Sequence, residues 1–169
     1  MMARASILRR GILRRAAATF LLLSLAASGE AAPQRGGGAT ATMDLSVSPA
    51  SIVFASADPD VAPVVIAAPV TVQIRVRQNA GPWQLTVLAN GDLISGADTV
   101  DITNVTWTAS PAPPFQSGTL SKTVAQRVAS GTANVNPPQS GSVTFRLANS
   151  WNYAAGTYSQ TLVFTLSAP

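Results

Sequence analysis

The sequence predicts an all-β protein, folded as an antiparallel β-sandwich of about seven to nine short strands. Apolar and polar residues alternate over successive short segments, which is the pattern of strands with one buried and one solvated face. Turn-forming residues separate these segments at intervals of about ten residues, a spacing typical of sandwiches. From residue 33 onward the chain contains 29 Ser and Thr residues, and no segment has the convincing period of an amphipathic helix.

The first predicted strand spans residues 39–48, where apolar residues at odd positions alternate with polar residues at even positions. Pro49 ends it, because proline cannot donate a hydrogen bond to a strand ladder. A short strand follows at 51–54, and the sequence Ala57-Asp58-Pro59-Asp60 predicts a turn. A short apolar piece at 64–68 then precedes Pro69.

The clearest alternation lies in the two following segments. Residues 70–77 carry Val or Ile at every even position and Thr, Gln or Arg at every odd one, which predicts a strand with one wet face. A turn at 79–82 leads to residues 83–89, where Trp83, Leu85, Val87 and Ala89 share one face. Asn90-Gly91 is a strong tight-turn signal that closes this strand.

The rest of the chain is more irregular. We expect a short strand at 93–94, a turn at 95–98, a strand at 100–108 and a proline-rich loop at 111–118. Residues 120–128 permit a helix, although Ser, Thr and Val are poor helix formers. A break at 137–141 and strands at 143–147 and 158–166 complete a single immunoglobulin-like sandwich domain over residues 42–169.

Residues 1–32 have the three-part composition of a secretory signal peptide: a basic stretch, a short apolar run and small residues. Cleavage is expected after Ala31 or Ala32, and the pair Arg9-Arg10 leaves both general secretion and twin-arginine export open. Residues 33–41, which include three consecutive glycines, are expected to form a flexible tether. The protein is therefore expected to be secreted and to lie outside the cell, at the cell surface or in the periplasm.

The net charge of +4 belongs to the leader. Five of the eleven basic residues lie within the first fifteen positions, and residues 33–169 contain six basic side chains and six Asp. A neutral, charge-poor domain has no field to steer it to phosphate groups, so no nucleic-acid partner is expected. No later apolar stretch approaches the length that spans a bilayer, so an integral membrane protein is not expected.

The chain contains neither His nor Cys. This excludes Ser–His and Cys–His nucleophiles and zinc or copper sites of the usual composition, so we expect no enzyme, metal or cofactor. Two pairs of acidic residues remain, Asp58 with Asp60 and Asp98 with Asp101. Both lie among turn residues, where Asp commonly accepts bonds from its own backbone, and this interpretation is preferred over a weak calcium site or paired catalytic carboxylates.

Aromatic residues are the groups most suited to binding a ligand in such a chain, because the apolar face of a sugar ring stacks on them. Trp83, Trp107 and Tyr158 follow the inward alternation and are expected in the core. Trp151 and Tyr153 lie in the polar segment Asn149-Ser150-Trp151-Asn152-Tyr153, and Phe115 lies in the proline-rich loop. These three are the candidate contact residues, with a role at the rim of the core as the alternative.

Two short motifs lie near the start and at the end of the predicted domain. Trp83-Gln84-Leu85 resembles the upstream Trp-x-Leu motif of bacterial WxL surface domains. Tyr158 begins a closing strand in which Phe164 and Leu166 stand where that family has a second Trp-x-Leu. The resemblance covers about residues 42–169 and implies a sandwich attached non-covalently to the cell wall. The sequence Ala155-Gly156-Thr157-Tyr158 is also similar to the turn before the last strand of spore-coat-U and pilin-like domains.

We therefore expect a secreted, non-catalytic cell-surface or cell-wall-associated binding or structural module. Its expected partners are a wall polysaccharide, peptidoglycan, further copies of itself or other surface proteins. The alternative is a fibre, pilus or coat subunit that assembles by exchange of its N-terminal strand, residues 39–48. The sequence leaves open the ligand, the oligomeric state, the type of cell envelope and whether that strand pairs within its own chain.

Overall fold

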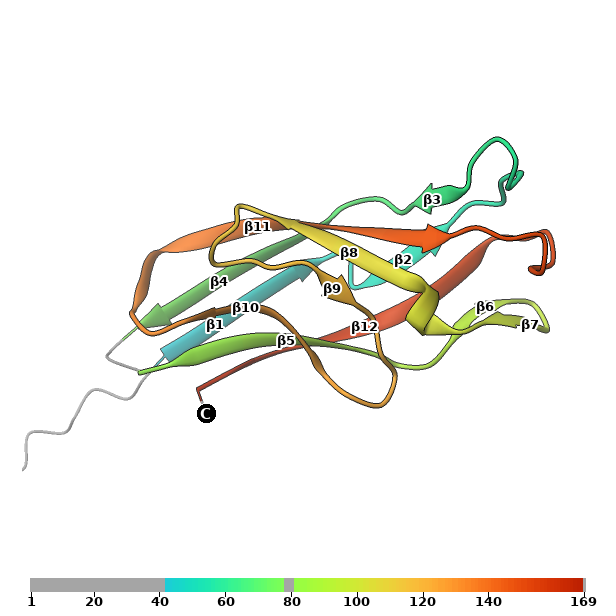
Figure 1. The fold of residues 1–169 in the computed structure, drawn as a ribbon. Coiled ribbons are helices and arrows are strands. Elements are labelled where there is room, and N and C mark those ends of the chain that lie inside the picture. Colours follow the sequence, from blue (N-terminus) through green and yellow to red (C-terminus); the bar gives the residue numbers. More distant parts are fainter. Residues whose placement is uncertain (1–41, 78–80, 169) are drawn as a thin grey trace, which may run out of the picture. The chain divides into compact units, whose positions relative to one another are not determined.

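A computed structural model describes residues 42–77 and 81–168, and in it two antiparallel β-sheets form a sandwich (Figure 1). The predicted leader 1–32, the predicted tether 33–41 and the first half of the predicted 79–82 turn lie outside the described residues. The expected all-β class is confirmed. None of the described residues belongs to a helix with the length and apolarity needed to cross a membrane.

The first sheet has the strand order β1-β4-β11-β8-β9, with β3 paired to β11. Its central pair joins the long β11 to β4, and β1 pairs with β4 over its whole length. Pro49 follows the end of β1, as predicted. The members of this sheet are β1 (Thr42–Ser48), β3 (Val64–Ile66), β4 (Val70–Arg77), β8 (Val105–Ser110), β9 (Gly118–Thr119) and β11 (Val135–Ala148).

The second sheet has the order β10-β5-β12-β6-β7, with β2 paired to β12. A 3-10 helix, η1 (Ile102–Asn104), joins β7 to β8 and interrupts the strand predicted over 100–108. The members of this sheet are β2 (Ser51–Phe54), β5 (Trp83–Ala89), β6 (Leu93–Ser95), β7 (Asp98–Val100), β10 (Gln126–Gly131) and β12 (Tyr158–Ser167).

The described residues form twelve strands, more than the seven to nine expected. Seven of the twelve have six or more residues, and the others are pieces of two to four residues. The longer strands follow the immunoglobulin arrangement, in which strands A, B, E and D form one sheet and strands C, F and G the other. Here β1, β4, β11 and β8 take the places of A, B, E and D, whereas β5 and β12 take those of C and F.

The core lies between the sheets and follows the predicted alternation. All four aliphatic residues of β4 and all four inward residues of β5 are buried. Trp83, Trp107 and Tyr158 are buried as expected, and each uses its polar atom: the Trp107 Nε1 donates to the carbonyl of Gln116 at 2.8 Å. Satisfying these polar atoms removes the main cost of burying such side chains.

Two local expectations were wrong. The prolines at 137–138 do not break the chain, because β11 continues through them with a register shift between Val135 and Gln139 opposite β4. Prolines are tolerated where a strand bulges and where one of its edges is unpaired, and β8 reaches β11 only from Ser142 onward. The helix permitted over 120–128 does not form; β10 begins there at Gln126.

Candidate functional site

Two of the three predicted contact residues line one pocket at an end of the sandwich. Trp151 is 68% exposed and Tyr153 is half-buried. Both belong to the loop between β11 and β12, which faces the loop between β2 and β3 across the pocket. Its floor is formed by core residues, among them Phe54, Leu147 and Tyr158. The pocket has a volume of about 250 Å³.

The two loops are held together by hydrogen bonds from Asn149. Its Nδ2 donates to the carbonyls of Ala57 and Ala62, each at 3.0 Å, and its backbone N–H donates to Pro63 at 2.9 Å. The Tyr158 hydroxyl donates to the carbonyl of Ala154 at 3.0 Å, which fixes the far side of the same loop. The pocket is therefore formed before any ligand arrives.

The indole of Trp151 is held in position by an acidic residue of the opposite loop. Its Nε1 donates to Asp60 Oδ1 at 3.1 Å. Asp60 is itself positioned by its backbone N–H, which donates to Asp58 Oδ1 at 2.9 Å. The turn predicted for this acidic pair is thus confirmed, and its second role is to orient an exposed aromatic ring.

The charge at the pocket is negative, since no basic residue lines it. Asp58 is exposed and is the charged residue among those that line it. Asp60 is also exposed and is bonded to the Trp151 indole that lines the pocket. In the described part of the chain, no three acidic residues gather closely enough to hold a metal ion. Such a pocket can offer an apolar stacking surface and carboxylate oxygens that accept hydrogen bonds.

The third candidate, Phe115, was predicted as a contact residue, and this prediction was wrong. It is 1% exposed and forms an isolated bridge with Ala129 of β10, so its side chain belongs to the core rather than to a contact surface. Gly141 of β11 lies directly beneath its ring, where a Cβ would collide with it. The proline-rich loop folds inward because Phe115 is the one large apolar side chain in the loop. The absence of a side chain at Gly141 leaves room for its ring in the core.

The residues that carry the WxL resemblance lie on neighbouring strands. Leu85 of β5 pairs with Leu166 of β12, and Phe164 pairs with Val87. Trp83, Leu85 and Tyr158 are buried, and the Trp83 Nε1 donates to the carbonyl of Ala133 at 2.9 Å. Phe164 and Leu166 are half-buried at the edge of the sandwich. In this chain these residues pack between the sheets.

The outer edge of β12 is the second candidate surface. The N–H of Leu162 donates to Ala50 on this side, whereas the carbonyl of Thr161 accepts from Asn90 on the β5 side. Because successive residues of a strand point their backbone groups to opposite edges, Phe164 and Leu166 direct theirs away from β5. No strand among the described residues pairs with this edge beyond Leu162.

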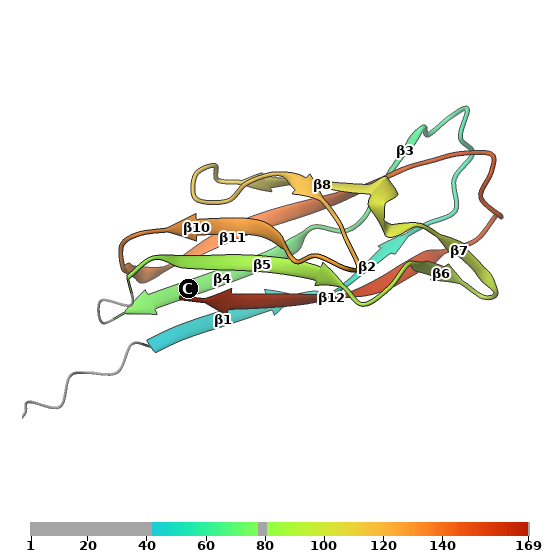
Figure 2. The same ribbon diagram turned by 60° about the horizontal axis from the view of Figure 1, so that its bottom comes forward.

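This open edge lies where an immunoglobulin domain has strand G, which pairs with strand F. Figure 2 shows β1 running beside β12 here, and the two strands are in contact although no ladder joins them. The inward-facing side chains along this seam are incompletely covered: Met43 is 38% exposed, and Leu45, Phe164 and Leu166 are half-buried. Both the backbone and the apolar side chains of the seam could accept a further strand.

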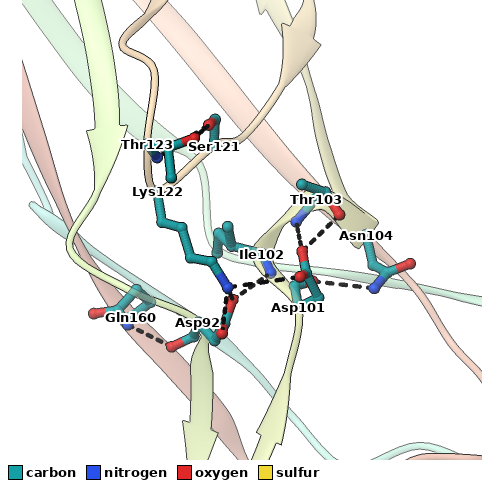
Figure 3. A network of polar contacts seen from close by, with 9 residues as sticks. All are labelled: Asp92, Asp101, Ile102, Thr103, Asn104, Ser121, Lys122, Thr123 and Gln160. Carbon is teal, nitrogen blue, oxygen red and sulfur yellow. Dashed lines mark hydrogen bonds and ion pairs between the residues drawn. The ribbon is translucent and has the colours of Figure 1, made fainter.

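A polar network ties the loop before β10 to the start of β6 (Figure 3). The Lys122 Nζ contacts both carboxylate oxygens of Asp92, at 2.8 and 2.6 Å, and lies 3.6 Å from Asp101 Oδ2. Asp92 also accepts from the backbone of Ile102 at 3.1 Å. Asp101 caps η1 by accepting from the N–H and the hydroxyl of Thr103, at 2.8 and 2.6 Å. The network holds three chain segments together.

Hydrogen bonds from Thr103, with a smaller contribution from the Lys122 charge, lower the pKa of Asp101 below its ordinary value of 3.8. A carboxyl with a lowered pKa stabilises the fold at pH above its ordinary value, and this contribution is lost as the pH falls through the lowered value. The hydrogen bond to Asp92 correspondingly raises the pKa of Lys122.

Thr103→Val is expected to raise the pKa of Asp101 toward 3.8 and to reduce the loss of stability in acid, because it removes the hydroxyl that contributes most to the shift. Lys122→Met removes a smaller contribution and should raise this pKa less. NMR titration of the Asp101 carboxyl in both variants measures which substitution raises its pKa more. A larger rise in Lys122→Met would contradict this assignment of causes.

The sequence predicted the aromatic residues of the pocket but not that the loop between β2 and β3 forms its opposite side. Asp60 and Trp151 are 91 residues apart and meet because β3 pairs with the end of β11. The polar segment around Trp151 was the one available signal for this site. The open edge of β12 had no sequence signal, because a paired and an unpaired strand show the same alternation.

Comparison of the chain with protein-family models found no match, and comparisons with curated proteins and with solved structures found none either.

Proposed function

We propose that this protein is a secreted, non-catalytic structural module of a cell surface, whose copies assemble by strand addition. A strand from the N-terminal segment of one copy pairs with the open edge of β12 in the next copy. The observation that carries this proposal is the unpaired edge at Phe164 and Leu166, in the position that strand G occupies in a complete immunoglobulin sandwich. Main-chain hydrogen bonds provide the affinity in this mode of assembly.

The donated strand should precede β1. Residues 42–48 pair with β4 of their own chain, so the predicted strand 39–48 is not free to exchange as a whole, and we propose residues 33–41 as the donated strand in its place. Nine residues reach at most about 30 Å when extended, whereas an edge of five residues is about 17 Å long.

Assembly outside the cell agrees with the rest of the chain. The leader at 1–32 would deliver the protein through a membrane, and residues 33–169 must fold without disulfides because the chain contains no Cys. Heterologous contacts of this kind, in which the donor and acceptor surfaces differ, propagate fibres unless the rotation between copies closes a ring. We therefore place the protein in a surface fibre or coat.

Deletion of residues 33–41 is expected to abolish assembly without destabilising the monomer, because β1 and its pairing with β4 remain intact. Sedimentation velocity of both proteins over a range of concentrations measures the assembly. A synthetic peptide of residues 33–41 should raise the Tm of the deletion variant by occupying the vacant edge. Undiminished assembly of the deletion variant would contradict the proposal.

The pocket at Trp151 favours a second function, attachment to a polysaccharide of the cell wall. An exposed Trp held by a hydrogen bond above an acidic turn is suited to stacking on a sugar ring. Co-sedimentation with insoluble wall polysaccharide and with peptidoglycan tests this function. Recovery of the protein in the soluble fraction at both low and moderate salt would contradict it.

A further inference from the structure

We infer that the pocket between the β2–β3 and β11–β12 loops binds one uncharged sugar ring of a neutral glycan, an inference that rests on the second proposed function. The indole of Trp151 forms the stacking surface. The carboxylates of Asp58 and Asp60 accept hydrogen bonds from ring hydroxyls at its edge. The site would thus distinguish neutral glycans from the acidic polymers that also occur in cell walls.

The first argument is the state of Trp151. A large aromatic side chain that is 68% exposed normally loses rotamer freedom when a ligand binds it. Here the bond from Nε1 to Asp60 has already fixed the ring, and the turn bond from Asp60 to Asp58 has fixed its acceptor. Binding therefore costs little side-chain entropy, which is how small contact areas achieve measurable affinity.

The second argument is rigidity of the walls. Asn149 cross-links the two loops through three hydrogen bonds to Ala57, Ala62 and Pro63. The backbone N–H groups of Val61 and Ala62 both donate to the carbonyl of Asp58, which closes the turn that carries the two acids. The distance between stacking surface and carboxylates is thus set by the fold rather than by the ligand.

The third argument is charge. Asp58 lines the pocket, Asp60 is bonded to the Trp151 indole that also lines it, and no Lys or Arg is among the lining residues. Uronate, phosphate or sulfate groups would meet like charge there with no basic group to pair with. Both carboxylates are exposed to solvent, so salt screens their attraction for a cationic group, and stacking area and hydroxyl bonding decide the preference.

The fourth argument is size. Pockets for drug-sized ligands measure about 300–1,000 Å³, and this one, at about 250 Å³, lies just below that range. Trp151, which lines the pocket, is 68% exposed, so the rest of a polymer could continue in solvent beside it. One ring of a chain is therefore the unit that fits, with neighbouring rings outside the pocket.

The test is titration of the full mature protein with soluble hexasaccharides, followed by calorimetry and by the NMR signal of the Trp151 indole N–H. The neutral probes are hexamers of glucose, mannose and galactose; the acidic probe is a galacturonate hexamer and the cationic probe a glucosamine hexamer. We expect at least one neutral hexamer to bind with little dependence on salt. The acidic hexamer should not bind.

Trp151→Ala should weaken binding of that neutral hexamer about tenfold or more, whereas Trp151→Phe should retain part of the affinity. Asp60→Asn should weaken it less, because the amide oxygen still accepts a hydrogen bond. Val61→Ala is the matched control: Val61 is 82% exposed on the same turn but does not line the pocket, and its loss should leave binding unchanged.

Three results would overturn the inference: a preference for the acidic or the cationic hexamer, binding that is unaffected by Trp151→Ala, or no binding of any neutral hexamer. Failure of the wall-attachment function would look different. In that case the protein would bind a soluble neutral hexamer but would not co-sediment with the insoluble wall.

Discussion

Trp107→Ala is expected to lower the free energy of unfolding by about 4 kcal/mol, a large share of the stability of an ordinary domain. The indole of Trp107 is 1% exposed, and its centre lies 6.2 Å from that of Phe145 on the neighbouring strand. Its Nε1 bonds to the carbonyl of Gln116, and Gly118 lies against its ring, where a Cβ would stand 2.5 Å from it. Removing the ring leaves a cavity that β-strands cannot easily close.

The matched control is Trp151→Ala, which removes the same side chain from an exposed loop. This change should alter stability by no more than about 0.5 kcal/mol. Urea unfolding followed by far-UV circular dichroism compares the two variants without relying on the fluorescence that each of them loses. Equal effects of the two substitutions would mean that Trp107 is not part of the core described above.

Phe164→Pro is expected to abolish assembly, while Phe164→Ala only weakens it. Both variants lose the half-buried ring, but proline also removes the backbone donor that a neighbouring strand would use. Because that N–H points away from β5, the two variants should be equally stable as monomers, within about 0.5 kcal/mol. Light scattering against concentration measures the assembly constant, which should fall at least tenfold further in the proline variant.

Thr165→Pro supplies the contrast at the next position. Its N–H points toward β5, where Thr165 pairs with Thr86. Proline at this position removes a ladder hydrogen bond and should destabilise the monomer by more than about 1 kcal/mol. If Phe164→Pro destabilises the monomer as much as Thr165→Pro, the edge at Phe164 is already paired and the proposed assembly is wrong.

The sequence predicted the strands wherever alternation is strict and turn residues flank it. The segments 70–77 and 83–89 became β4 and β5 with these bounds, because each buries every second residue between the sheets. The acidic turn at 58–60 was also predictable, since Asp forms such turns with its own backbone. These strands and this turn are determined by residues that are close together in the sequence.

Features that depend on distant contacts were not predictable. Phe115 is buried because it packs beside β10 and Gly141. Its own loop contains four prolines or glycines, a composition that predicts an exposed loop. The prolines of β11 are tolerated because the strand has a free edge beside them, which only the sheet order reveals. The same holds for the contact of Trp151 with Asp60, which lie 91 residues apart in the sequence.

The open edge of β12 is tested most directly by amide hydrogen exchange, residue by residue, in the monomer and in the assembled protein. In the monomer, the N–H groups of Val163 and Thr165 should be protected by β5, whereas those of Phe164 and Leu166 should exchange rapidly. On assembly, Phe164 and Leu166 should become protected. Protection of these two amides in the monomer, or rapid exchange of both in the assembled protein, would contradict strand addition at this edge.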